Sequence, residues 1–221
     1  MDAYADPDTV ARYAEGPPRL VPGFADLLCM AGMLLGERVG EDARLLVLGA
    51  GGGLEMRAFA RAHPGWRFDG VDPSAQMLAL ARQTLGTDAA RATLHHGYVD
   101  VAPDGPFDAA ACLLTLHFVA PDQRVDTLRA LHRRLRPGAP LVVAHMSIAA
   151  DQRERWLDRY AAFAVSSGIA PAAAAKGRAA VATHLHIASP AQDEAFLREA
   201  GFATVEPFYQ GLAFRGWVAV A

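Results

Sequence analysis

Residues 45–53 read LLVLGAGGG, a run of four aliphatic residues that breaks into a turn made almost entirely of glycine. A short apolar run of this kind predicts a strand that is buried on both faces, which is typical of a parallel sheet. Gly49, Gly51 and Gly53 permit positive φ and let a ligand approach the backbone with no Cβ in the way. The stretch therefore predicts either a ligand site at the end of this strand or a tight strand–helix connection without a ligand.

Strand and helix patterns alternate on both sides of this turn. Strands are expected at 44–48, 67–71, 92–96, 107–116 and 140–146, with helices at 53–63, 73–85 and 121–135. Such alternation predicts a doubly wound parallel sheet with helices on both faces. The last two strands, FATVEPFYQ and LAFRGWVAV, meet at Gly211 with no room for a crossover helix, so they must pair antiparallel. We expect an α/β fold with a mostly parallel sheet and a C-terminal antiparallel hairpin.

Composition is that of an ordinary folded protein, with 221 residues, a net charge of −3 and 52% hydrophobic residues. We expect one domain over 1–221, with N-terminal helices in 1–40 and a helical insertion at 150–188 that could cap an acceptor site. Interspersed charges argue against a nucleic-acid partner. The acidic start MDAYADPDTV is unlike a signal peptide, and no apolar run is long enough for a membrane span, so we expect a cytoplasmic protein without a membrane partner.

Cysteine and histidine spacing gives no metal signature. Cys29 and Cys112 lie in apolar surroundings, so we expect buried, inert thiols. His184 and His186 could share one face of a strand, but no acid or cysteine stands nearby. We therefore predict no metal site.

Leu54 and Asp72, which both follow the glycine turn in the sequence, help to distinguish among nucleotide ligands. Leu54 occupies the place where a dinucleotide fingerprint has its third glycine, which favours a nucleoside over the pyrophosphate of a nicotinamide cofactor. Asp72 ends the second predicted strand, where a carboxylate can accept hydrogen bonds from both hydroxyls of a ribose. It could equally cap the helix that Pro73 is placed to open, and the two roles are compatible.

Four successive segments, GAGGG, FDGVDPSAQMLALAR, FDAAACLLTLHFV and RLRPGAPLVV, resemble the motifs of class I S-adenosylmethionine-dependent methyltransferases. That family has a Rossmann-like seven-stranded sheet with a C-terminal antiparallel hairpin. The resemblance implies S-adenosylmethionine as the cofactor. It also implies a cofactor site made of Gly49, Ala50, Gly51, Gly53, Asp72, Pro73, Met77, Tyr98, Val99 and Leu114. In this interpretation the glycines line the methionine and ribose, Asp72 holds the ribose hydroxyls, and the turn at Tyr98 meets the adenine.

A narrower resemblance covers nearly the whole chain. VPGFADLLCMAGMLL, LLTLHFVAPDQR and FYQGLAFRGWVAVA are similar to carboxy-S-adenosylmethionine synthases of the tRNA wobble-uridine pathway, which make a carboxymethyl sulfonium from S-adenosylmethionine and prephenate. Three positions depart from that family. Tyr98 and Leu113 stand in place of an acid and an amide, and Phe196 matches an arginine that pairs with the carboxylate of the cofactor. Because removing one partner of a buried ion pair costs roughly 3–5 kcal/mol, these departures favour methyl over carboxymethyl chemistry.

Methyl transfer needs mainly proximity and orientation, with a base only where the acceptor must lose a proton. His117 follows the fourth predicted strand and His145 lies near the end of the fifth, so both are candidate bases, although either could be structural. Aromatic residues could wall an apolar acceptor pocket or pack in the core: Trp156, Tyr160, Tyr209 and Trp217.

The sequence thus predicts a methyltransferase that uses S-adenosylmethionine and acts on an unidentified small-molecule acceptor. One alternative is an enzyme like the carboxy-S-adenosylmethionine synthases. Another is a non-catalytic protein that binds S-adenosylmethionine or S-adenosylhomocysteine, which is suggested by Val47, where many class I methyltransferases have an acid, and by Tyr98 and Leu113. The apolar helix predicted at 24–35 could pack on a second copy in a homodimer.

Overall fold

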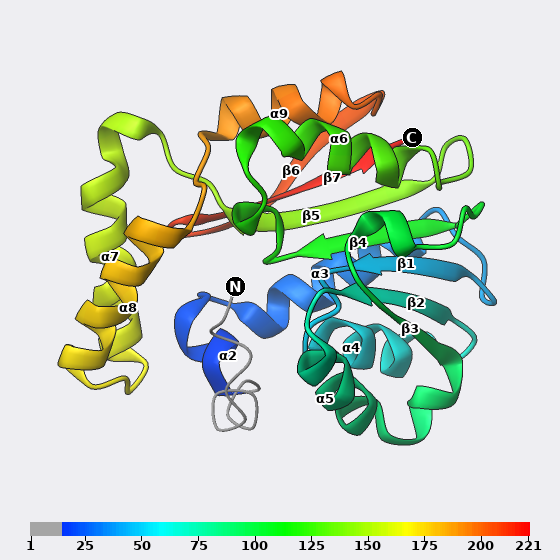
Figure 1. The fold of residues 1–221 in the computed structure, drawn as a ribbon, viewed down its shortest axis with the longest axis horizontal. Helices are drawn as coiled ribbons and strands as arrows, with labels where there is room; N and C mark the ends of the chain where they lie inside the picture. Colours follow the sequence, from blue (N-terminus) through cyan, green and yellow to red (C-terminus); the bar gives the residue numbers. More distant parts are fainter. Residues whose placement is uncertain (1–14) are drawn as a thin grey trace.

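The structure is a computed structural model that describes residues 15–221. The start of the chain, on which the absence of a signal peptide was inferred, lies outside the described residues. A seven-stranded sheet with the order β3-β2-β1-β4-β5-β7-β6 forms the centre of the molecule (Figure 1). Its strands are β1 Arg44–Leu48, β2 Arg67–Asp72, β3 Ala92–His96, β4 Ala109–Leu113, β5 Pro140–Met146, β6 Thr204–Gly211 and β7 Phe214–Val220.

Strands β1 to β5 pair in parallel, whereas β7 pairs antiparallel with both β5 and β6. The predicted mostly parallel sheet with a C-terminal hairpin is confirmed. Strand β1 lies between β2 and β4, so the winding of the sheet reverses at the carboxyl end of β1. Ligands bind at such switch points in open α/β sheets, and the glycine turn lies at this one.

Helices cover both faces of the sheet (Figure 1). One face carries α3 Phe24–Gly36, α4 Leu54–Ala62 and α5 Ala75–Leu85, and the other carries α6 Pro121–His132 and α9 Pro190–Glu199. Side chains of β5 alternate between these layers. Met146 packs in the core beneath α3, whereas Val143 packs in the core beneath α6 and α9. The same alternation places the side chains of His145 and Met146 on opposite faces of the sheet.

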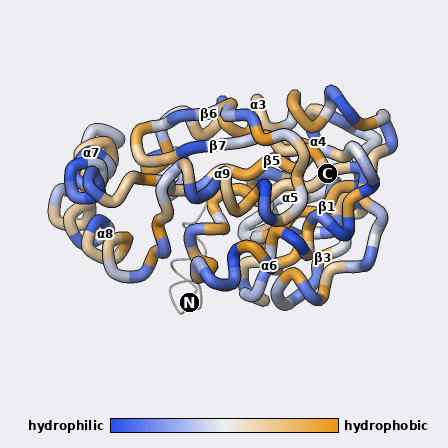
Figure 2. Tube along the Cα trace, turned by 90° about the horizontal axis from the view of Figure 1, so that it is seen from above, coloured by the Kyte–Doolittle hydropathy of each residue, from blue (hydrophilic) through white to orange (hydrophobic). Residues whose placement is uncertain are grey.

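A helical pair stands beyond the carboxyl ends of the parallel strands, where the sequence predicts an insertion. It consists of α7 Arg153–Ser166 and α8 Pro171–His184, and α2 Gly16–Leu20 packs against α7. Figures 1 and 2 show the pair at one end of the molecule, with hydrophilic residues along α7. Short 3-10 turns complete the described elements: η3 Gly86–Arg91, η4 Val99–Val101, η5 Leu116–Phe118 and η6 Ala150–Gln152.

Some local predictions need correction. Helix α5 begins at Ala75 and not at Pro73, because Ser74 is the N-cap and accepts from the Met77 amide at 3.3 Å. Strand β4 ends at Leu113, well before residue 116, because Leu114 has a φ of 55° and leaves the strand conformation. Cys29 is exposed and only Cys112 is buried.

Ser189 and Gln192 have the sequence spacing of a capping box, and they form one at the start of α9. Among residues 15–221, no helix is long and apolar enough to cross a membrane.

Candidate cofactor and acceptor site

The glycine turn holds three residues at positive φ, with values of 76° at Gly49, 47° at Gly51 and 78° at Gly53. Packing alone requires two of these glycines. A Cβ on Gly49 would lie 1.9 Å from Oγ1 of Thr115, and one on Gly53 would lie 3.0 Å from Cα of Ala81. A tight strand–helix connection therefore explains part of the motif, and the residues around the turn indicate whether a ligand binds there.

Asp72 lies directly beside the turn. Its Oδ2 accepts from the amide of Gly51 at 2.9 Å, and its Oδ1 accepts from the amide of Ser74 at 2.9 Å. Burial raises the pKa of this carboxyl above its ordinary value, and the two backbone donors and His96 work against the rise. Each oxygen keeps a lone pair for a further donor, so the carboxylate can receive two adjacent hydroxyl groups.

The other predicted cofactor residues line the same edge of the sheet. Ala50 is fully buried, and its amide donates to Val71 at 3.0 Å. The Gly97 amide donates to the backbone oxygen of Asp72 at 3.1 Å, which brings the turn carrying Tyr98 and Val99 beside the acid. Pro73 links Asp72 to the helix that contains Met77. The structure thus gathers the predicted set on neighbouring turns.

A second acid, which sequence reasoning missed, lies in the first turn of α4. Glu55 is buried, and burial raises its pKa to about 8, with the carboxylate of Asp72 adding to the effect. The sequence could have indicated that Glu55 is buried, because it precedes Phe59 by four residues and therefore lies on the same face of the helix. Val47, where an acid is common in class I methyltransferases, is fully buried in the apolar core.

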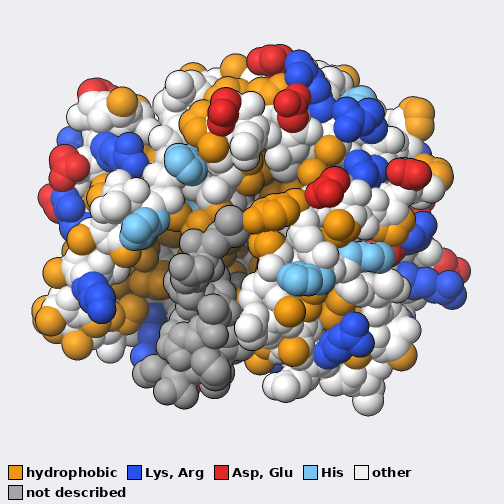
Figure 3. All heavy atoms as spheres, viewed as in Figure 1, with side chains coloured by type: hydrophobic (Ala, Val, Ile, Leu, Met, Phe, Trp, Pro, Cys, Tyr) orange, Lys and Arg blue, Asp and Glu red, His pale blue; other side chains and the backbone are white. Residues whose placement is uncertain are grey.

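A cavity of about 620 Å³ opens next to the cofactor edge. Leu114 lies in its wall, and Thr115, the next residue, contacts the glycine turn. Figure 3 shows hydrophobic side chains gathered in the hollow between the α7–α8 pair and the sheet. Most lining residues are apolar, and they come from α2 and the residue after it, the ends of β4 and β5, the α7–α8 pair with its connecting segment, and β7: Leu20, Val21, Met146, Ile169, Val181 and Phe214 among others.

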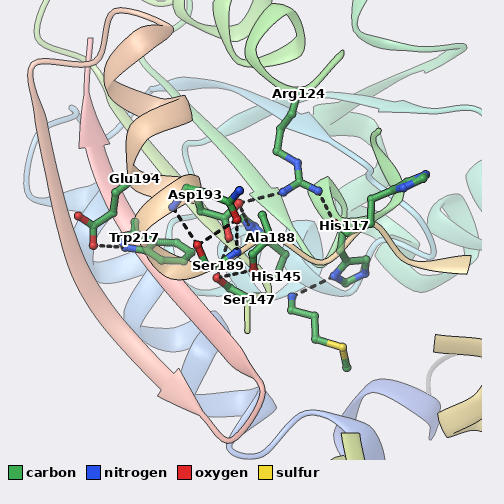
Figure 4. Close-up of polar contacts among 12 residues, drawn as sticks. His117, Arg124, His145, Ser147, Ala188, Ser189, Asp193, Glu194 and Trp217 are labelled. Atoms are coloured by element: carbon green, nitrogen blue, oxygen red, sulfur yellow. Dashed lines mark hydrogen bonds and ion pairs between the residues drawn. The ribbon is translucent and has the colours of Figure 1, made fainter. Parts of the chain in front are cut away.

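His117 is a buried polar group in the wall of this cavity. Its Nδ1 accepts a hydrogen bond from the amide of Met146 at 3.0 Å (Figure 4). Burial, together with the nearby His145 and Arg124, lowers the pKa of His117 to about 3. The imidazole is therefore neutral and fixed in orientation.

His145 lies on the opposite face of the sheet and does not line the cavity. Its Nε2 is 3.1 Å from Oδ1 of Asp193, and its ring lies 5.6 Å from that of Trp217 (Figure 4). Successive side chains of a strand point to opposite faces, so the burial of Met146 toward the cavity directs His145 away from it. The structure therefore places His145 apart from the cavity that His117 lines, and its role as a base stays a prediction.

Asp193 is the centre of a buried polar network. It accepts from Arg124 at 2.9 Å and from the hydroxyl of Ser147 at 2.6 Å. Burial acts to raise the pKa of Asp193, but its contacts with His145, Ser147 and Arg124 outweigh burial and hold it below the ordinary value. Arg124 also donates to the backbone oxygen of His186. Because the His186 amide donates to the His117 oxygen at 2.8 Å, the network fixes the segment that carries the cavity histidine.

Several predicted side chains lie elsewhere. Of the four aromatic candidates for the acceptor pocket, Tyr160 lines the cavity and the other three do not: Trp156, Tyr209 and Trp217. Phe196 packs in the core on the α6–α9 face, against the guanidinium of Arg124. Phe196 is not among the residues that line the cavity, and its match to a cofactor-binding arginine stays a prediction. Within residues 15–221 no three potential metal ligands cluster, although His184 lies in the cavity wall.

Comparisons with known proteins agree with this geometry. A family model described as a methyltransferase domain matches residues 46–141. The carboxy-S-adenosyl-L-methionine synthase of Chromohalobacter salexigens is 30% identical over 223 residues, which covers 97% of this chain and 82% of the relative. A relative of the same name from Pseudomonas fluorescens SBW25 is 28% identical, and the match covers 96% of this chain and 90% of the relative.

Solved structures share the fold at low identity. An O-methyltransferase family protein from Burkholderia thailandensis has a TM-score of 0.72 at 14% identity, and the match covers 98% of this chain and 61% of that protein. Human N-acetylserotonin methyltransferase, solved with S-adenosylmethionine, has a TM-score of 0.65 at 14% identity, with 98% and 57% covered. The chain therefore spans about three fifths of the length of these two structures.

The sheet order, the glycine turn and its carboxylate define a class I S-adenosylmethionine-dependent methyltransferase fold. This chain belongs to the S-adenosylmethionine-dependent methyltransferase family. Within that family it groups with relatives named carboxy-S-adenosyl-L-methionine synthase. It is an enzyme of the transferase class, and its cofactor is S-adenosylmethionine.

Proposed function

We propose that this enzyme transfers the methyl group of S-adenosylmethionine to a small molecule bound in the cavity beneath α7 and α8. One observation carries the proposal. Thr115 contacts the glycine turn at Gly49, and its neighbour Leu114 lines the cavity, so the cofactor edge and the cavity share a wall. The backbone of Leu114 has a φ of 55°, a strained conformation for a non-glycine residue and of a kind that clusters at functional sites.

The residues at the cofactor edge fit a nucleoside with an amino-acid tail. The side-chain-free turn at Gly49, Gly51 and Gly53 lets a ligand approach the backbone closely, and Asp72 has free lone pairs for ribose hydroxyls. We assign the adenine-binding end of the site to Tyr98 and Val99, which lie in the turn beside Asp72. We assign Ala50, Pro73, Met77 and Leu114 to the walls of the site.

The protein contributes to methyl transfer by orienting the acceptor and the cofactor and by excluding water from them. The bound sulfonium supplies a methyl group that is already activated, so orientation supplies most of the remaining rate enhancement. The apolar lining from α7, α8 and β7 excludes water from the acceptor. In this proposal the insertion at 150–188 is the cap that selects the acceptor.

Isothermal titration with S-adenosylmethionine and S-adenosylhomocysteine tests the cofactor site. The wild type should bind both, and Asp72→Ala should weaken binding by about 100-fold, because two hydrogen bonds to a charged group are lost. Asp88→Ala is a matched control, since this aspartate pairs with Arg91 in η3, away from the turn. If the folded wild type binds neither compound, the proposal is refuted. Unchanged binding by Asp72→Ala would show that the ribose contact is misassigned.

A second candidate is the carboxymethyl chemistry after which the relatives are named. Arg19 lines the cavity and lies 3.8 Å from Glu15, and both side chains are exposed. Incubation with S-adenosylmethionine and prephenate, followed by mass spectrometry, separates the two chemistries, because a carboxymethyl sulfonium has a distinct mass.

Two further predictions concern the environment of the protein. The exposed Met33 on α3, 63% accessible, supports the predicted homodimer through that helix. Sedimentation of wild type and Met33→Glu tests the dimer, which the charge should weaken. The cytoplasmic location stays a prediction.

Retained binding of S-adenosylhomocysteine without turnover across acceptors would favour the non-catalytic alternative.

A further inference from the structure

The hydrogen bond between Met146 and His117 fixes where the imidazole carries its proton. A backbone N–H can only donate, so Nδ1 of His117 must offer a lone pair to it at 3.0 Å. A neutral imidazole has one N–H group, which must then be on Nε2. Burial also lowers the pKa of His117 to about 3, which agrees with a neutral ring.

The protonated nitrogen lies on the edge of the ring that is turned away from Met146. His117 lines the cavity, and its Nε2 has no hydrogen-bond partner among the described residues. The ring therefore presents an N–H donor to the acceptor site. A general base needs a free lone pair on the atom that meets the acceptor, and here the lone pair is used by the backbone.

We propose that His117 donates its Nε2–H to an ionised oxygen of the methyl acceptor. The acceptors are then small, largely apolar carboxylic acids or acidic phenols, which enter the cavity as anions. This inference rests on the proposed methyl transfer and adds the substrate class. It also replaces the role of base that the sequence suggested for His117.

An anionic acceptor balances the reaction without a base. A lone pair of the oxygen forms the bond to the methyl carbon, and the carbon–sulfur bond breaks with its electron pair going to sulfur. The negative charge of the oxygen and the positive charge of the sulfonium cancel. No proton moves, and the products are a methyl ester or methyl ether and S-adenosylhomocysteine.

The surroundings of His117 agree with this role. The wall is mainly apolar, so a hydrogen bond to an anion is stronger there than in water. Of the other ionisable groups that line the cavity, Tyr160 is buried, whereas Glu15, Arg19 and His184 are exposed. Glu15 and Arg19 form an ion pair on α2, and His184 ends α8.

A pair of variants separates a donor from a base at this position. In His117→Gln the amide oxygen can accept from the Met146 N–H while the NH₂ group donates into the cavity, yet the side chain cannot act as a base. In His117→Phe neither function remains. The probe is 4-nitrophenol in mildly alkaline buffer, where it is ionised, and nitrobenzene is the uncharged control of similar shape. Equilibrium dialysis in the presence of S-adenosylhomocysteine gives the affinities.

The wild type should bind 4-nitrophenolate more tightly than nitrobenzene, and His117→Gln should stay within about threefold of it. His117→Phe should lose about 10- to 100-fold in affinity for 4-nitrophenolate and none for nitrobenzene. This is the usual contribution of a hydrogen bond to a charged group. Equal binding of both probes by the wild type, no binding of either, or a loss in His117→Gln as large as in His117→Phe would overturn the proposal.

Nitrogen-15 NMR of the histidine side chains is independent of the stability of His117→Phe. It should show the proton of His117 on Nε2, and a proton on Nδ1 would refute the inference. Titration of S-adenosylhomocysteine into each variant separates the two proposals. Failure of the wild type to bind it refutes the methyltransferase proposal, whereas normal binding with a negative probe result refutes only the role of His117.

Discussion

The buried carboxyl of Glu55 predicts an unusual dependence of stability on pH. Its ordinary pKa of 4.5 is raised to about 8 in the folded protein, mainly by burial. Between these values the folded state keeps a proton that the unfolded chain has lost. The resulting stabilisation is fully present below pH 4.5, falls as the pH rises, and is lost above about 8.

The magnitude follows from the gap between the two pKa values. At about 1.36 kcal/mol per pH unit, the full gap corresponds to a loss of at most about 5 kcal/mol in the free energy of unfolding. A domain of ordinary stability has roughly 5–15 kcal/mol in total, so even half of this loss is easily measured. Glu55→Gln removes the titrating group but keeps the shape of the side chain and a similar capacity for hydrogen bonds.

Urea unfolding between pH 5 and pH 9, followed by fluorescence of the buried Trp66 and Trp217, measures the effect. Wild type should lose stability relative to Glu55→Gln as the pH rises, and the difference should become constant above about pH 8. Glu41→Gln, at an exposed position before β1, is the matched control and should follow the wild type. A constant difference between wild type and Glu55→Gln across the whole range would refute the reasoning.

Two substitutions and one labelling experiment test the site and the packing around it. Gly49→Ala should abolish binding of S-adenosylhomocysteine in titration and cost about 1–3 kcal/mol in urea unfolding, because its Cβ would meet Thr115 at a positive φ; wild-type affinity would contradict this. Asp193→Ala should cost about 3–5 kcal/mol in the same unfolding assay, since it leaves a buried guanidinium without its acid, and a loss below about 1 kcal/mol would contradict the network. A thiol reagent should label Cys29 in the native protein and Cys112 only after unfolding, because burial raises the pKa of the Cys112 thiol to about 12; equal labelling rates would contradict the structure.

Much of the fold could be predicted because hydrophobic periodicity and turn residues act locally. The strand bounds 44–48, 92–96 and 140–146 agree with the structure, and the capping box at Ser189 is formed. Element ends were less predictable where they depend on tertiary contacts. Leu114 ends β4 early because its amide donates to Ala144 of the neighbouring strand from a left-handed conformation, which no local propensity encodes.

The two candidate bases show a limit of the sequence pattern. Strand β5 is buried along its whole length, so its residues give no alternation from which to assign a face. A shift of one residue moves a side chain to the opposite side of the sheet. His145 and His117 therefore looked equivalent in sequence, and only the packing of Met146 toward the cavity and of His145 toward Asp193 separates them.

The acceptor cavity was the least predictable feature, because each segment contributes only one or a few side chains to it. His117 comes from η5, Tyr160 from α7, Val181 from α8 and Phe214 from β7. Tyr160 and Val181 belong to no motif, and the alanine-rich α8 buries only Ala174. The helical pair can therefore change its lining residues without disturbing the sheet or the glycine turn. Acceptor choice is thus separable from the fold, and the fixed N–H of His117 is the feature that constrains it most.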